Sequence, residues 1–321
     1  MKARVISVII FALFLAAPAR AADYPTHPIR LIVPTSPGGV NDIVARLLQP
    51  GLVAALKQPI VIENKSGANN IIGTDFVAKS APDGYTLVVV PASHSVNPAV
   101  NSKMPFDTEK DLTPIILVGK NPMLFLVNPQ VPARSVKELA ALAKASPDKF
   151  SYATPGPASQ AHLIVSQWQN IAGVNVTQIP YRGGAPATLA TISGETQFTV
   201  MSSLVAAPQV ESGKLRPLAI GSLKRDPHFP DVPTMEEAGY PGIEAVTWVG
   251  LFAPAGTPRD IIERLNKVID QIIHDPDIAA KLDAQGITID GGPPEALGKL
   301  VSEEIKRWRV VAQQNHISVD R

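Results

Sequence analysis

The chain lacks cysteine altogether. That absence excludes disulfide bonds, thiol catalysis, and zinc or iron–sulfur sites held by cysteine. Histidine is scarce, and no two of the six histidines stand four residues apart, the spacing with which one helix presents two imidazoles to a metal ion. A G-x-S-x-G elbow, a P-loop and a G-x-G-x-x-G fingerprint after the first apolar run are missing too. The sequence therefore predicts no metal and no cofactor.

The first residues have the order of a secretory signal. A basic start, MKAR, precedes an apolar run of 13 residues, VISVIIFALFLAA, and a small-residue site follows at Ala19-Arg20-Ala21. We predict that residues 1–21 are a signal peptide, cleaved near Ala21, and that the mature protein lies in the periplasm. The alternative is a retained membrane anchor, although a spanning helix needs about 20 apolar residues.

Charge of either sign is not in excess in the mature chain. Cleavage would remove Lys2, Arg4 and Arg20 from the 29 basic residues, which leaves 26 against 28 acidic ones. A near-neutral protein has no electrostatic attraction for nucleic acid or an anionic membrane. Without disulfides the remaining 300 residues must rely on a hydrophobic core, and they are enough for two domains.

Short apolar runs alternate with amphipathic stretches along the chain. Runs rich in Val, Ile and Leu predict strands over residues 29–34, 59–64, 85–91, 115–119 and 123–128. Helices are predicted between them, one with a capping box at Ser135 and Glu138, one ending at Gly173. Pro50 and Gly51 predict a kink or a brief break in the first helix. This alternation indicates an α/β fold with a mainly parallel sheet.

Turns rich in glycine and hydroxyl side chains lead from several strands into helices. In VPTSPGGVND, Gly38 and Gly39 allow close approach to the backbone, and a helix starting near Asn41 offers free N–H groups to an anion. Asn41 or Asp42 is expected to cap that helix. Similar turns are SGANNIIG, PASHSVNP, SYATPGPASQAHL and IPYRGGAPATLA. Each alone is either a plain turn or an anion site; together they favour a cleft beyond the carboxyl ends of the strands.

Two side chains in the last of these turns leave alternatives open. Arg182 either grips a carboxylate bidentately or is a cation at the surface or at a domain contact. Tyr181 either walls the pocket or packs against its neighbours. The sequence does not decide between these alternatives.

The segments YPTHPIRLIVPTSPGGVNDIVARLL, PDGYTL, IPYRGGAPA and WVGLFAPAGTP resemble those of the solute receptors of tripartite tricarboxylate transporters, also called Bug-type receptors. The resemblance covers nearly the whole mature chain. It implies a fold like the type II periplasmic binding proteins, with a ligand cleft and hinge strands. Lobe 1 would comprise residues 22–119 and 247–321, and lobe 2 residues 120–246. The resemblance further implies a monomer that captures a small carboxylate and delivers it to a membrane permease with large and small subunits.

In such receptors main-chain N–H groups, hydroxyls and water hold the carboxylate without a salt bridge. Carried over by motif, the ligand site comprises Ser36, Gly38, Gly39, Asp42, Ser93, Ser95, Thr154, Ser159, Tyr181, Gly183, Gly184, Ala185 and Ser202. Met201 stands where many members have an aspartate, and this departure argues against an amino-acid ligand. Pro50 is a second departure, expected to tilt the start of the first helix.

Two other functions remain open at this point. A ligand-sensing partner of a membrane sensor kinase would need the same binding chemistry. A periplasmic enzyme on the same fold would have His94, Asp42 and Ser93 as its candidate residues, although the sequence pairs no base with a nucleophile.

Overall fold

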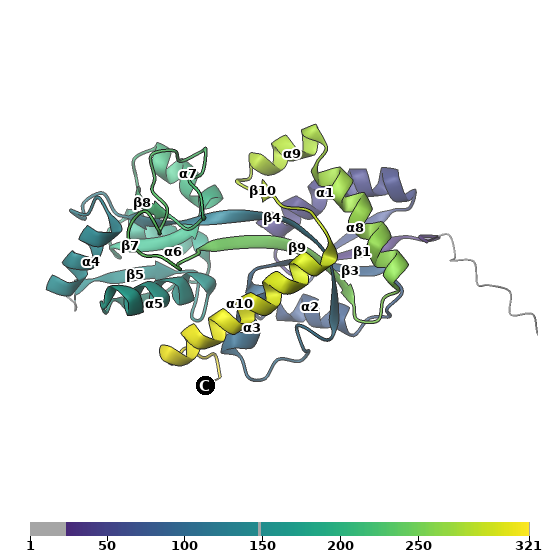
Figure 1. Ribbon diagram of the computed structural model, residues 1–321, viewed down its shortest axis with the longest axis horizontal. Helices are drawn as coiled ribbons and strands as arrows, with labels where there is room; N and C mark the ends of the chain where they lie inside the picture. Colours follow the sequence, from purple (N-terminus) through teal and green to yellow (C-terminus); the bar gives the residue numbers. More distant parts are fainter. Residues whose placement is uncertain (1–23, 147–148, 321) are drawn as a thin grey trace, which may run out of the picture.

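The computed structural model describes residues 24–146 and 149–320, so the predicted signal peptide lies outside the described residues. Figure 1 shows two halves, each a sheet flanked by helices, joined by two long strands. The predicted α/β fold is confirmed. Among the helices of the described residues, none is both long and apolar enough to cross a membrane.

The first half is built around three parallel strands, in which β1 lies between β2 and β3. The chain enters it through β1 (Ile29–Val33), α1 (Val40–Leu56), β2 (Ile60–Asn64), α2 (Ile71–Ala78), β3 (Thr86–Pro91) and α3 (Ser93–Val100). It returns at the end through α8 (Arg259–Ile273), α9 (Pro276–Asp283), β10 (Thr288–Ile289) and α10 (Pro294–Gln314). Because β1 and β3 are parallel, the turns that follow them share one edge of the sheet.

The second half repeats this arrangement around β5, which is parallel to both β6 and β7. Its elements are α4 (Val136–Ala145), β5 (Ser151–Thr154), α5 (Gln160–Ala172), β6 (Thr177–Pro180), α6 (Gly184–Ile192), β7 (Phe198–Ser202), α7 (Ser203–Glu211) and β8 (Arg216–Ile220). The expected helix signals are present: Ser135 Oγ accepts from Glu138 N at 3.1 Å, and Gly173 ends α5 with a φ of 61°.

The halves are joined by β4 (Leu112–Val127) and β9 (Val246–Pro254), which pair with each other in antiparallel fashion. The two strands predicted at 115–119 and 123–128 are therefore one strand, and that prediction was wrong. Pro122 is the last residue of β4 in register with β9, and pairing with β7 begins at Met123. The missing N–H of proline thus falls where the strand changes partners, a place at which a strand tolerates it.

Among the strands of the described residues, parallel pairing is confined to β1, β2 and β3 in the first half and β5, β6 and β7 in the second, and the predicted turns follow strands of these two groups. Beside the parallel strands, β4 runs antiparallel to β7, β8, β9 and β10, and β3 runs antiparallel to β9. The expectation of a mainly parallel sheet was therefore too simple. Continuous apolar runs identified strands that are covered on both faces, but they carried no information on strand direction.

Helix α1 runs through Pro50 without the expected break. Proline removes one helical hydrogen bond, but Leu48 and Leu52 on either side of it are buried in the core and hold both parts of the helix in line. The capping residue also differs from the expectation. It is Gly39, in an extended conformation and without a side-chain cap, rather than Asn41 or Asp42.

Helix α10 contributes to the cores of both halves. Leu297, Val301 and Ile305 pack with residues of β1, β3 and β9 in the first half. Trp308 and Val311, further along the same helix, pack with residues of α4, α5 and β7 in the second half. In Figure 1 this helix runs diagonally below the long strands and meets their right-hand end. Both the strands and the helix therefore link the two halves.

Candidate functional site

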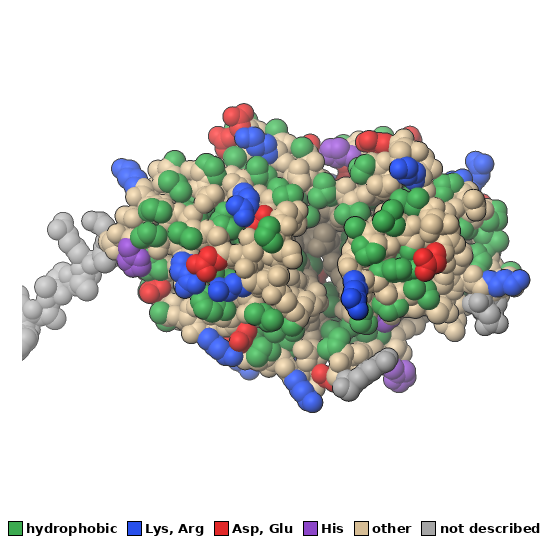
Figure 2. All heavy atoms as spheres, turned by 180° about the vertical axis from the view of Figure 1, so that it is seen from behind, with side chains coloured by type: hydrophobic (Ala, Val, Ile, Leu, Met, Phe, Trp, Pro, Cys, Tyr) green, Lys and Arg blue, Asp and Glu red, His purple; other side chains and the backbone are tan. Residues whose placement is uncertain are grey.

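A cavity of about 330 Å³ lies between the two halves. Seen from behind, the surface of the molecule is hollowed between them (Figure 2). The residues lining the cavity come from the first half, the second half and the two long strands: Thr35, Val40, Asn41, Pro91, Gly119, Asn121, Met123, Pro155, Ser159, Gln160, Ala161, Gly184, Met201, Ser202, Val205, Thr247, Trp248, Val249 and Ile287. None of these described residues carries a charge.

Four helices begin at this cavity. Helix α1 starts at Val40, α5 at Gln160, α6 at Gly184 and α7 directly after Ser202, and all these residues line it. Each helix follows a strand, so the cavity lies beyond the carboxyl ends of β1, β5, β6 and β7, where open α/β sheets bind ligands. A helix start has unpaired N–H groups and the positive end of the helix dipole. The cavity therefore suits an anion, although it contains no cation.

The turn before α1 is held by Asp42, which is only 2% exposed. Its carboxylate accepts from Gly38 N at 2.9 Å, from Asn64 Nδ2 at 3.0 Å and from both ends of the Arg46 guanidinium. The hydrogen bond from Arg46 is the largest cause that lowers the pKa of Asp42, to about 2. Gly38 has a φ of 80°, in the left-handed region that glycine favours. Asp42 thus fixes this turn and does not itself line the cavity.

The two turns of the second half are bonded to each other. Tyr181 N donates to Thr154 O at 2.9 Å, and Gly183 N donates to Pro155 O at 3.1 Å. Thr154 is fully buried; its hydroxyl donates to Gly156 O at 3.0 Å and accepts from Gln178 at 2.7 Å. Gly183 has a φ of 113°, which a residue with a side chain rarely adopts. The pairing places the starts of α5 and α6 side by side.

The predicted residues Ser93 and Ser95 lie in the first turn of α3, which follows β3, but do not line the cavity. The Ser93 hydroxyl accepts from Asn70 Nδ2 at 2.6 Å. Ser95 is fully buried, and its hydroxyl faces Ala92 O and the carboxylate of Glu304. Pro91, the last residue of β3, does line the cavity. Ser93 and Ser95 therefore bind other parts of the protein and have a structural role.

Of the thirteen predicted site residues, Ser159, Gly184 and Ser202 line the cavity. Five others do not line it but stand within one or two residues of lining residues: Ser36, Gly38, Gly39, Gly183 and Ala185. Tyr181 packs against the hydrophobic cluster that contains Met201, and burial raises the pKa of its phenol to about 12. Of the two alternatives for Tyr181, the structure therefore supports packing against its neighbours.

Sequence reasoning missed the residues that the long strands and the loop before β10 contribute. Asn121, in β4, is an example: its amide donates to Gln285 O and Gly286 O, and its oxygen accepts from Ser203 N at 3.1 Å. It ties the first half to the start of α7 at the floor of the cavity. The only available signal was a polar residue between two apolar runs, which was interpreted as a break between strands.

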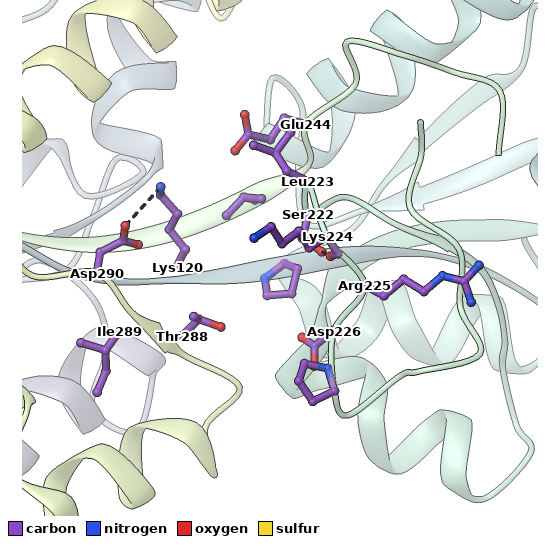
Figure 3. Close-up of a pocket in the computed structure, with 13 residues that line it drawn as sticks. Lys120, Ser222, Leu223, Lys224, Arg225, Asp226, Glu244, Thr288, Ile289 and Asp290 are labelled. Carbon is purple, nitrogen blue, oxygen red and sulfur yellow. Dashed lines mark hydrogen bonds and ion pairs between the residues drawn. The ribbon is translucent and has the colours of Figure 1, made fainter. Parts of the chain in front are cut away.

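A second hollow, of about 500 Å³, lies beside the same strands (Figure 3). Lys120 and Pro122 line it, whereas Gly119, Asn121 and Met123 line the first cavity, as expected from the alternation of side chains along a strand. Lys120 pairs with Asp290 at 3.4 Å, and Arg225 on the opposite loop pairs with Glu237. No helix begins among the residues that line this hollow, whereas four begin at the first cavity, so the first cavity remains the candidate site.

The enzyme candidates do not form a catalytic set. His94 is buried between Phe106 and Phe252, and burial lowers its pKa to about 3, so it stays neutral. Asp42 and Ser93 are bonded to other residues, as described above, and no hydrogen bond joins either of them to His94. Within the described part of the chain, no group of three or more metal-ligating side chains could hold a metal ion.

The fold and the interlobe cavity define a class, that of the periplasmic binding proteins with a type II-like fold. The model of the tripartite tricarboxylate transporter family receptor matches residues 44–317. The chain therefore belongs to this family of transporter receptors, which are binding proteins and not enzymes. The resemblance read from its motifs is confirmed.

Relatives of known name or structure cover almost the whole chain. Protein BugT of Bordetella pertussis is 37% identical over 312 residues, which are 97% of this chain and 96% of the relative. The R. palustris protein Rpa4515, solved with adipate, is 33% identical with a TM-score of 0.82, over 92% of this chain and 99% of that one. MatC from Rhodopseudomonas palustris, solved with malate, is 34% identical with a TM-score of 0.78, over 90% and 99%.

Proposed function

We propose that the protein captures a small carboxylate and delivers it to the membrane permease, with large and small subunits, of a tripartite tricarboxylate transporter. The observation that carries the proposal is the cavity at which four helices begin and which no charged side chain lines. An anion in such a cavity is held by N–H groups and helix dipoles. The two solved relatives contain adipate and malate, both carboxylates.

The free donors around the cavity support a carboxylate. Thr35 Oγ1 is buried without a hydrogen-bond partner, and Ser159 uses its oxygen to accept from His162 N, so its own proton remains available. A hydrogen bond to a charged group contributes about 1.5–3 kcal/mol. The ligand's oxygens would be bound by these hydroxyls, by Ser202, and by the backbone around Ser36, Gly38–Gly39 and Gly183–Ala185. Asp42, Thr154 and Tyr181 would act by fixing those turns, and Ser93 and Ser95 by fixing the start of α3.

Closure of the two lobes would complete the site. We assign residues 22–119 and 247–321 to lobe 1 and residues 120–246 to lobe 2, with crossings in β4 near residue 120 and just before β9 near residue 246. Closure excludes water, and each N–H to carboxylate contact becomes stronger as the local dielectric falls. The receptor would work as a monomer in the periplasm, after removal of residues 1–21.

Calorimetry on mature protein that has been unfolded and refolded, to remove carried-over ligand, tests this proposal. The panel contains mono-, di- and tricarboxylates and aromatic acids, with uncharged amides of the same acids as controls. We expect at least one carboxylate to bind and its amide not to bind. If no carboxylate binds, or if an amide binds as tightly as its acid, the proposal is wrong.

A further inference from the structure

Part of the cavity wall is apolar. Met123 and Met201 from the second half of the molecule, Val249 from β9 and Ile287 from the loop before β10 line it, together with Val205 of α7. Met201 is 3% exposed, and its Sδ lies 3.9 Å from the point at which a Cβ of Gly184 would stand. A methionine thioether therefore lies directly beside the start of α6. Whatever extends from an anion bound there meets sulfur and hydrocarbon.

The amide side chains of the wall are already committed to the protein. Asn121 Nδ2 donates to two carbonyls, Gln285 O at 3.1 Å and Gly286 O at 2.7 Å. Gln160 Nε2 donates to Val246 O at 2.8 Å, and Asn41 Nδ2 donates to Val89 O at 3.3 Å. These bonds brace the backbone of both halves, so a ligand that recruited the amides would have to break them. These side-chain amides are therefore not free to bind a second anionic group.

A second carboxylate in this part of the cavity would be poorly compensated. Burial of a charge without a hydrogen-bonding partner is strongly unfavourable, and the side chains of Met123, Met201, Val205, Val249 and Ile287 offer it no donor. An ammonium group would fare no better, because no carboxylate lines the cavity either. Apolar groups, in contrast, gain from burial, and thioethers make favourable contacts with aromatic rings.

On the basis of the function proposed above, we propose that the ligand is an organic acid with a single carboxylate and an apolar body, aliphatic or aromatic. The carboxylate is bound at the helix starts and the body lies against Met123, Met201, Val249 and Ile287. Dicarboxylates, hydroxy-tricarboxylates and amino acids are disfavoured. A volume of about 330 Å³ is near the lower end of the usual range for ligand pockets, which suits a body of the size of benzoate or hexanoate.

Hexanoate and adipate provide a matched pair for the test, because they differ only in a second terminal carboxylate. Calorimetry on the refolded mature protein should give a dissociation constant for hexanoate at least tenfold below that for adipate. In the series butyrate, pentanoate and hexanoate, affinity should rise about fourfold per methylene. Benzoate should bind more tightly than malate, citrate or aspartate.

Three outcomes of this experiment are distinguishable. Tighter binding of hexanoate or benzoate supports the inference. Tighter binding of adipate, malate or citrate overturns it and leaves the carboxylate receptor standing. Failure of every acid to bind overturns both the inference and the proposed function.

The variant Met201→Gln tests the wall itself, with Met201→Leu as the control. Glutamine is close to methionine in length but adds a polar amide, so the ratio of hexanoate to adipate affinity should fall about tenfold. Leucine keeps the wall apolar, so the ratio should stay within about twofold of the original. An unchanged ratio in a folded Met201→Gln protein, with thermal melting as the check on folding, would show that the ligand body lies elsewhere.

Discussion

Gly184, the first residue of α6, lines the cavity, and its N–H has no acceptor among the described residues. Gly184→Pro removes this single donor. Proline is tolerated at the first position of a helix because that N–H makes no helical bond. Gly183 before it has a ψ of 175°, which is compatible with a following proline. The substitution therefore removes one N–H and leaves the helix in place.

The expected loss in binding follows from the charge of the ligand. One hydrogen bond to a carboxylate contributes about 1.5–3 kcal/mol, so the dissociation constant of the tightest-binding acid should rise about 10- to 150-fold. Gly184→Ala is the control, because it keeps the N–H. Its Cβ would meet Met201 Sδ at 3.9 Å, an ordinary contact, so binding should change by less than about threefold.

Calorimetry measures both variants, and thermal melting confirms that both are folded. Val40→Pro, with Val40→Ala as its control, repeats the test on the opposite side of the cavity at the start of α1. Our reasoning would be refuted if the proline and alanine variants bound equally well at both positions. In that case, the N–H groups at the helix starts would not hold the anion.

Three further predictions concern charge and stability. Asp42→Asn should lower the free energy of unfolding at pH 7 by about 1–2 kcal/mol, because the pKa of Asp42 is depressed to about 2 in the folded protein. This stabilisation is present above the unfolded pKa near 4 and is lost as the pH falls through 2. Urea melts of the two proteins should therefore converge in acid. Binding should be flat between pH 6 and 8, since no residue lining the cavity titrates there; a midpoint near 6.5 in calorimetric titrations would implicate a histidine instead. Raising NaCl from 50 to 500 mM should weaken binding less than about threefold, because no charged side chain lines the cavity; a steep salt dependence would point to a surface cation such as Arg182.

Local patterns predicted most elements of the fold but not the connection between its halves. Helix α5 was predicted from Leu163, Ile164 and Trp168 at helical spacing and Gly173 at its end, and all of these signals are local. The long strand β4 was not, because Lys120, Asn121 and Pro122 have the composition of a turn. Their extended conformation depends on pairing with β9, more than a hundred residues later, and the local sequence contains no trace of it.

The site was predictable to the same extent. The turns at Gly38–Gly39 and Gly183–Gly184 could be found because glycine at positive φ and a following helix leave a sequence signature. The apolar wall could not, because Met123, Val249 and Ile287 have the same composition as core residues. They line a cavity only because β4, β9 and the loop before β10 meet there. Ser93 and Ser95 show the converse error, since these hydroxyls follow a strand but are bonded to Asn70, Ala92 and Glu304 and do not line the cavity.

The most direct test of the central claim is a crystal structure of the refolded protein with the acid that binds most tightly. We expect the carboxylate in the interlobe cavity, with its oxygens 2.7–3.1 Å from backbone N–H groups at the starts of α1 and α6. A carboxylate bound instead by a lysine or arginine side chain, or located in the hollow beside Lys120 and Asp290, would contradict the account.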